Sequence, residues 1–76
     1  MEEMLRVLVK ELVDDPSKIE INSKKEGNTT TLELKVAQED MGKVIGKQGK
    51  IAKSIRTLMK AYGAKYNEKI NVDILD

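Results

Sequence analysis

The 76-residue sequence contains no cysteine, histidine, phenylalanine or tryptophan. The absence of cysteine excludes disulfides and thiolate metal sites. The absence of histidine removes the side chain that most often shuttles protons near neutral pH and binds metals. No run approaches the ~18 apolar residues of a membrane span, and the start of the chain, MEEMLRVLVK, carries acids where a secretory signal would carry bases. We therefore expect a cytoplasmic protein with no cofactor and no contact with a membrane.

Charge of one sign is missing from one long segment. The whole chain has a net charge of +1, from 14 basic and 13 acidic residues. Residues 41–67 contain no acid, whereas seven bases lie there: Lys43, Lys47, Lys50, Lys53, Arg56, Lys60 and Lys65. All 13 acids lie in the rest of the chain. This separation predicts a molecule with one side that attracts anions.

The N-terminal half alternates between helical and strand periodicity. Five apolar residues have the spacing of a one-sided helix, which Pro16 ends: Leu5, Leu8, Val9, Leu12 and Val13. Ile19 and Ile21 then share one side of a strand. The pair Gly27 and Asn28 is a turn signal, because both residue types tolerate a positive φ. A returning strand has a second set of alternating apolar residues, at Leu32, Leu34 and Val36. The pattern predicts a β-hairpin after the first helix.

The C-terminal half predicts two further helices and a last strand. Residues 37–45 form a short helix, and a second helix ends near Gly63; its apolar positions are Ile51, Ile55, Leu58, Met59 and Tyr62. Of these we assign Ile51, Ile55 and Leu58 to the core. Alternation resumes in KINVDILD at the end of the chain. The order is α-β-β-α-α-β, so we expect one α+β domain over residues 1–76. Its three-stranded sheet carries every helix on one face, and the two-helix link allows a parallel crossover.

Three glycines in the basic segment suggest a loop that binds phosphate. The spacing from Gly42 to Gly46 is one residue short of a Walker A loop, and Gln48 stands where its hydroxyl residue belongs. A dinucleotide fingerprint would need a glycine at Val44. The remaining interpretation is a G-x-x-G turn between two helices, Gly46 to Gly49, where the backbone turns tightly and a second backbone can approach without meeting a Cβ. The loop leads into a helix N-terminus, which attracts phosphate.

The stretch VIGKQGKIAKSI, residues 44–55, resembles the I-G-x-x-G-x-x-I signature of the KH RNA-binding domain. The element order is similar to the type II, prokaryotic arrangement, and the chain length is similar to that of small bacterial single-domain KH proteins of the KhpA type. The resemblance implies an RNA-binding regulator or RNA chaperone that works with a second, larger KH protein. Such proteins are associated with cell-envelope growth and cell shape. A homodimer or a heterodimer is expected, because pairing two weak sites raises avidity.

The resemblance also implies where RNA lies: in a groove for about four unpaired nucleotides whose backbone the G-x-x-G loop clamps. Mapped onto this sequence, the clamp is Gly46, Lys47, Gln48 and Gly49. Ile45 and the Leu34/Val36 edge form the groove floor. The charges that steer the RNA backbone are Lys43, Lys50, Lys53 and Arg56. Because aromatic stacking is scarce, we expect modest affinity and little base selectivity.

The sequence is also compatible with two other functions. The helix–turn–helix around the loop would suit duplex DNA if the basic helix entered the major groove, although beyond Gln48 that helix has no Asn or Gln to read bases. The basic side would alternatively suit an acidic protein or a ribosome surface. Catalysis is not expected, because the carboxylate pairs Asp14–Asp15 and Glu39–Asp40 have no accompanying nucleophile or further ligands, and local backbone chemistry accounts for both.

Overall fold

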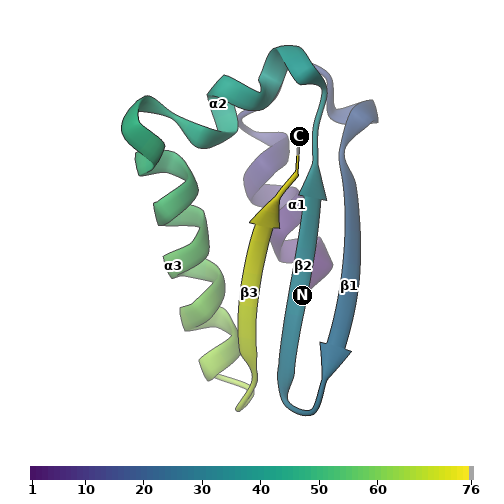
Figure 1. Cartoon of the computed structure of the whole chain (residues 1–76), viewed down its shortest axis with the longest axis vertical. Helices are drawn as coiled ribbons and strands as arrows, with labels where there is room; N and C mark the ends of the chain where they lie inside the picture. Colours follow the sequence, from purple (N-terminus) through teal and green to yellow (C-terminus); the bar gives the residue numbers. More distant parts are fainter. Residues whose placement is uncertain (76) are drawn as a thin grey trace.

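The computed structural model describes residues 1–75 and has the predicted order α-β-β-α-α-β (Figure 1). The helices and strands are α1 (Glu2–Lys10), β1 (Glu20–Glu26), β2 (Thr29–Lys35), α2 (Met41–Ile45), α3 (Lys50–Ala64) and β3 (Lys69–Ile74). Three short 3-10 turns join them: η1 (Pro16–Lys18), η2 (Gln38–Asp40) and η3 (Lys47–Gly49). Along residues 1–75, no helix combines the length and the apolar character that a membrane crossing requires.

The sheet has the strand order β1-β2-β3, with β2 in the centre. β1 and β2 form the predicted antiparallel hairpin, in which Glu26 and Thr29 flank a two-residue turn and Gly27 supplies a positive φ of 61°. β2 and β3 are parallel, with Leu32 opposite Val72. The long α1 and α3 cover one face of this sheet, as predicted, while its other face stays open (Figure 1).

The core lies between the sheet and the two long helices. Leu5 and Val9 of α1 meet Met59 of α3 and Leu32 of β2, and each of these four side chains is fully buried. α1 ends at Lys10, one turn earlier than the apolar spacing suggests, although Leu12 and Val13 still pack against the core. Burial of each large aliphatic side chain contributes about 1.5–3 kcal/mol, so this one cluster dominates the stability of a small chain.

One detail of α3 corrects the sequence-based assignments. Leu58 was assigned to the core but is 54% exposed, because the inward stripe of α3 passes through Ala52, Ile55, Met59 and Gly63. α3 ends at Ala64, next to Gly63, as the sequence predicts. A Cβ on Gly63 would lie 2.7 Å from Ile70 Cγ1, so this glycine allows α3 to pack closely on β3. The left-handed residue after the helix is Asn67, with φ 58°.

Candidate nucleic-acid interface

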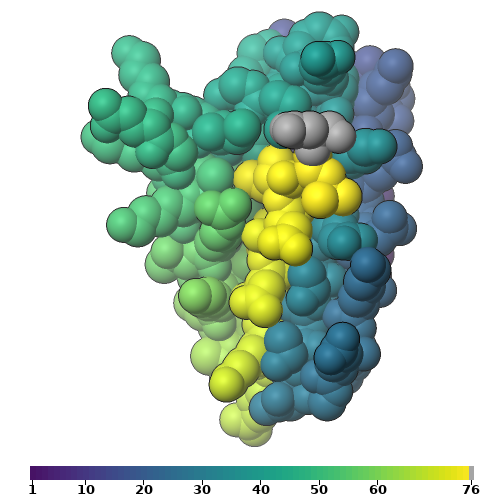
Figure 2. Space-filling view, viewed as in Figure 1, coloured from purple at the N-terminus to yellow at the C-terminus, as the bar shows by residue number. Residues whose placement is uncertain are grey.

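The G-x-x-G loop connects α2 to α3 at the end of the sheet where β2 and β3 finish (Figure 1). In the space-filling view this part of the chain stands out from the body of the molecule at the upper left (Figure 2). Lys47 and Gln48 are exposed, while the two glycines are half-buried. The loop is therefore accessible from solvent along its whole length.

The two glycines of the loop are required for different physical reasons. Gly46 has φ 73° and ψ 179°, a backbone region that is essentially restricted to glycine. A Cβ there would also lie 2.5 Å from Ile51 Cγ1, so the chain passes directly over the Ile51 side chain. Gly49 is left-handed, with φ 74° and ψ 13°, and a Cβ there would meet nothing within 4 Å. Gly46 thus sets the close packing of the turn, and Gly49 sets only its direction.

Two of the four backbone donors in the loop are left without a protein acceptor within residues 1–75. Gln48 is left-handed, with φ 57° and ψ 28°, an uncommon conformation for a residue with a side chain. Gly46 N–H donates to Gly42 O at 2.8 Å and Gly49 N–H to Gly46 O at 3.3 Å. Within residues 1–75, no acceptor pairs with the N–H groups of Lys47 or Gln48. Successive free N–H groups in a turn of mixed handedness form a concave site for an anion.

The basic segment keeps most of its charge unpaired. Among the ion pairs of residues 1–75, the only base from 41–67 that takes part is Lys43. The remaining bases are exposed, and four of them follow one side of α3, starting at the loop: Lys50, Lys53, Arg56 and Lys60. This stripe, which we call the basic stripe, continues the positive potential of the loop along the helix.

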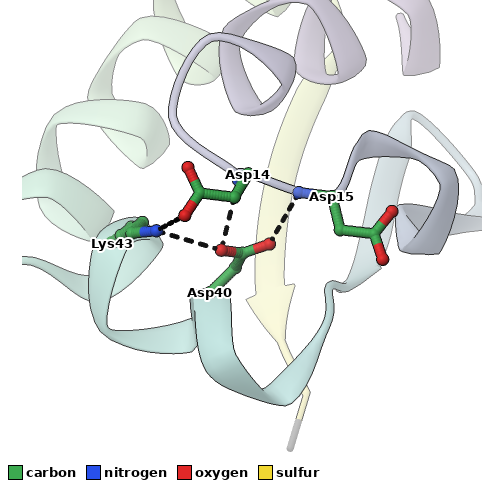
Figure 3. A network of polar contacts seen from close by, with 4 residues as sticks. All are labelled: Asp14, Asp15, Asp40 and Lys43. Atoms are coloured by element: carbon green, nitrogen blue, oxygen red, sulfur yellow. Dashed lines mark hydrogen bonds and ion pairs between the residues drawn. The ribbon is translucent and has the colours of Figure 1, made fainter.

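Lys43 is held by carboxylates rather than left free (Figure 3). Its ammonium donates to Asp14 and, at 3.4 Å, to Asp40 Oδ1. Hydrogen bonding to Asp14 is the main reason that the pKa of Lys43 is raised. The sequence suggested that Lys43 steers phosphate from one turn before the loop. In the structure its charge is largely balanced before any ligand arrives.

Asp40 is the residue that the sequence-based interpretation missed. It is 2% exposed, and its Oδ1 and Oδ2 accept the backbone N–H groups of Asp14 at 3.2 Å and Asp15 at 3.1 Å. Burial disfavours the charged carboxylate, but these two N–H groups and Lys43 outweigh that effect, so the pKa of Asp40 is lowered. The acid at the start of α2 is visible in the sequence. Its partners lie 25 and 26 residues away, and no local pattern identifies them.

A groove between α3 and β3 runs from Arg56, in the middle of α3, toward the end of the sheet that is remote from the loop. It consists of two adjoining hollows, which share Lys60 of the basic stripe and Asn71 of β3. β3 is an edge strand, and Arg56 Nε donates to its Val72 carbonyl at 3.2 Å across this groove. The sequence-based assignment placed the strand side of the groove at Leu34 and Val36, whereas residues of β3 line it in the structure.

The proposed apolar floor is only partly accessible. Ile45, next to the loop, is 38% exposed and available for contact. Val36 is half-buried and lines a separate hollow with Lys35, Gln38 and Met41. Leu34 was also assigned to the floor, but it is fully buried in the central strand. A side chain in the core cannot touch a ligand, so the assignment of Leu34 is corrected.

The family comparison matches nearly the whole chain. Residues 2–74 match the sequence model of the family described as "KhpA/KhpB, KH domain". This match includes every helix and strand and the complete G-x-x-G turn.

Two curated relatives and one solved structure are similar to the chain. A protein named "RNA-binding protein KhpA" from Clostridium perfringens is 49% identical over 75 residues, which cover 99% of this chain and 100% of that protein. A protein of the same name from Listeria monocytogenes is 47% identical over 76 residues, with both chains fully covered. The crystal structure of a variant of Aquifex aeolicus Era bound to GDP and aluminium fluoride matches with a TM-score of 0.65 at 18% identity. That match covers 95% of this chain but 28% of the Era chain, and it supports the fold alone.

Proposed function

The chain belongs to the KhpA/KhpB KH-domain family, and from that premise we propose that it binds single-stranded RNA and catalyses no reaction. The observation that carries the proposal is the loop between α2 and α3. It combines two unpaired N–H groups with an exposed, unpaired lysine on either side of Gln48 and Gly49. Relatives named as RNA-binding proteins over their full length support the same assignment.

The loop provides a binding site for the sugar-phosphate backbone of the RNA. A phosphate placed on it accepts hydrogen bonds from Lys47 N–H and Gln48 N–H, while the ammonium groups of Lys47 and Lys50 balance its charge. Because glycines flank this position, no Cβ of Gly46 or Gly49 keeps the nucleotide away. These contacts recognise the backbone and carry no base information.

The neighbouring nucleotides extend along the basic stripe. Lys53 and Arg56 supply further charge for backbone phosphates, and the groove wall on β3 offers Asn71 to the bases. Ile45 is the exposed aliphatic surface next to the loop, and it packs against a base in place of an aromatic ring. Lys43 contributes little directly, because Asp14 and Asp40 already bind it. We expect about four nucleotides per site, with modest affinity and weak base selectivity.

Lys47→Asp with Gln48→Asp tests this function. Both glycines remain, and aspartate tolerates the left-handed conformation of residue 48 better than most residues. The expected result is an unchanged circular dichroism spectrum and loss of binding to a short single-stranded RNA. Lys18→Asp with Asn28→Asp is the matched control, because it makes the same change in net charge at exposed positions in η1 and the hairpin turn. An equal loss of RNA affinity in both variants would contradict a specific binding site at the loop.

The salt dependence of binding gives an independent measure of the contacts. Each neutralised phosphate of a single strand lowers the logarithm of the affinity by about 0.7 for each tenfold rise in salt.

The two alternative functions make different predictions. Equal affinity for duplex DNA and single-stranded RNA would favour a protein that binds duplex DNA. Binding to an acidic protein that survived the loop charge reversal would favour a protein-interaction module.

We further propose that a second copy of this chain pairs with the first through the outer side of the helical layer. Met4 and Leu8 of α1 and Leu58 and Tyr62 of α3 line an apolar hollow there, with Lys65 at its rim. A second site raises the avidity of a weak groove.

Leu58→Asp tests this pairing by light scattering coupled to size-exclusion chromatography. We expect a dimer for the parent chain and a monomer for the variant, with unchanged circular dichroism. If the parent chain is monomeric alone but binds a larger KH protein through this surface, the assembly is a heterodimer and not a homodimer. In the cytoplasm, such an assembly would act as an RNA chaperone or post-transcriptional regulator. A link to cell shape and cell-wall growth rests on the family resemblance.

A further inference from the structure

The buried side chain of Asp40 lies at the base of the segment formed by residues 41–49, which we call the arm and which consists of α2 and the G-x-x-G loop. Asp40 is the last residue of η2 and directly precedes α2. α2 has five residues and only Val44 of it is buried, so few apolar contacts hold this arm against the core. The arm therefore depends on other contacts to keep one orientation.

Asp40 supplies those contacts to a distant part of the chain. Its two oxygens bind the N–H groups of Asp14 and Asp15, in the segment that follows α1 (Figure 3). Lys43, one turn along α2, reaches back to the Asp14 side chain and to Asp40 itself. The cluster thus fastens both Asp40 and the first turn of α2 to the 13–15 segment. Among residues 1–75, no buried side-chain polar atom is left without a partner, so the cluster is fully satisfied.

We propose that Asp40 is a positioning residue for RNA binding: it fixes the arm and thereby the angle at which Gly46–Gly49 meet the RNA backbone. This inference rests on the proposed function of the loop. Asp40 is buried and three residues before Lys43, so it acts through α2 and does not touch the ligand. A free arm samples several orientations, and the apparent dissociation constant rises in inverse proportion to the fraction that is competent to bind.

Asp40→Asn is the informative substitution, because it keeps the size of the side chain and one acceptor oxygen. Its amide group places a donor against one of the two N–H groups, so one of the hydrogen bonds to the 13–15 segment is lost. Glu39→Gln is the matched control. Glu39 is the neighbouring residue in η2, is exposed, and has no hydrogen bond or ion pair within residues 1–75. Both substitutions remove one negative charge at nearly the same place.

The two variants separate positioning from simple electrostatics. Removing an acid makes the protein more positive, so charge alone predicts slightly tighter binding to a short single-stranded RNA for both variants. Positioning predicts weaker binding for Asp40→Asn alone, by about fivefold if the competent orientation falls to about one fifth of the population. Measurements are made at a temperature where both variants are fully folded by circular dichroism.

Amide hydrogen exchange provides a readout that does not involve RNA. If Asp40 positions the arm, exchange at the Asp14 and Asp15 amides, whose acceptors are the Asp40 oxygens, accelerates in Asp40→Asn and not in Glu39→Gln, while amides of the central strand β2 stay protected. If Asp40 contributes only to global stability, exchange rises throughout the core and the affinity of the folded protein is unchanged, which would overturn the proposal. If the parent binds RNA and Lys47→Asp with Gln48→Asp binds it equally well, the proposed function of the loop is wrong. The exchange measurement still shows in that case whether Asp40 fixes the arm.

Discussion

Replacement of Gly46 by alanine tests the packing of the loop most severely. The backbone at this position, φ 73° and ψ 179°, costs a residue with a side chain about 1–3 kcal/mol. The new Cβ would lie 2.5 Å from Ile51 Cγ1 and 2.8 Å from Ile51 Cβ and Cδ1. Displacing the Ile51 side chain adds roughly 1–3 kcal/mol of strain. We therefore expect Gly46→Ala to lower the free energy of unfolding by roughly 2–6 kcal/mol.

Gly49→Ala is the control within the same loop. Its φ of 74° is equally positive, but a Cβ there would meet nothing within 4 Å. Only the left-handed conformation is penalised, at about 1–2 kcal/mol. The total stability expected for a chain of this length is about 4–11 kcal/mol. Both variants are compared by urea unfolding at low temperature, followed by circular dichroism, and a Gly46→Ala chain that is already unfolded without urea counts as the larger loss.

A double-mutant cycle with Ile51→Ala isolates the steric part. Truncation of Ile51 removes the Cγ1 and Cδ1 atoms that the new Cβ would strike but keeps the Ile51 Cβ at 2.8 Å. Gly46→Ala should therefore cost less in that background, by a part of the roughly 1–3 kcal/mol of steric strain. The reasoning is refuted if Gly46→Ala costs no more than Gly49→Ala, or if its cost does not change when Ile51 is truncated.

Four further predictions concern particular residues. Gly63→Ala should destabilise the fold by about 1–3 kcal/mol because its Cβ would meet Ile70 and the Glu68 carbonyl. By contrast, Gly42→Ala in α2 should stabilise it by about 0.5–1 kcal/mol because a Cβ there meets nothing; urea unfolding should give opposite signs. Gln48→Gly should raise stability by up to about 1 kcal/mol by removing a side chain from a left-handed position, and a loss of stability would show that the Gln48 side chain stabilises the turn. The pKa of Asp40 is lowered by folding, so its contribution is present above the ordinary value of 3.8 and lost as the pH falls through the folded value; the parent should lose stability below about pH 4 more steeply than Asp40→Asn, and parallel curves would contradict the buried hydrogen bonds.

Much of the architecture could be predicted because it depends on local patterns. Alternation through Leu32 and Leu34 identified β2, the Gly27–Asn28 pair identified the hairpin turn, and the length of the link from residue 36 to residue 69 allowed the parallel crossover. The loop was found for the same reason, because four consecutive residues, Gly46–Gly49, determine its backbone.

The errors arose where a long-range contact decides the outcome. The periodicity of α3 has two neighbouring apolar stripes, and only the position of the sheet determines that Met59 points inward while Leu58 faces solvent. The end of α3 beside Gly63 was predicted correctly, but the contact of this glycine with Ile70 of β3 is not visible in the local sequence. The partners of Asp40 lie 25 and 26 residues earlier, so its role could be recognised only in three dimensions.

The most direct test of the account is an NMR titration of the parent chain with a short single-stranded RNA. We predict that the largest amide shift changes fall on residues 46–50, with smaller changes along the basic stripe and in β3 near Asn71. If the RNA binds and changes the chemical shifts of other amides but not those of residues 46–50, the loop does not bind the RNA backbone and the proposed function is wrong.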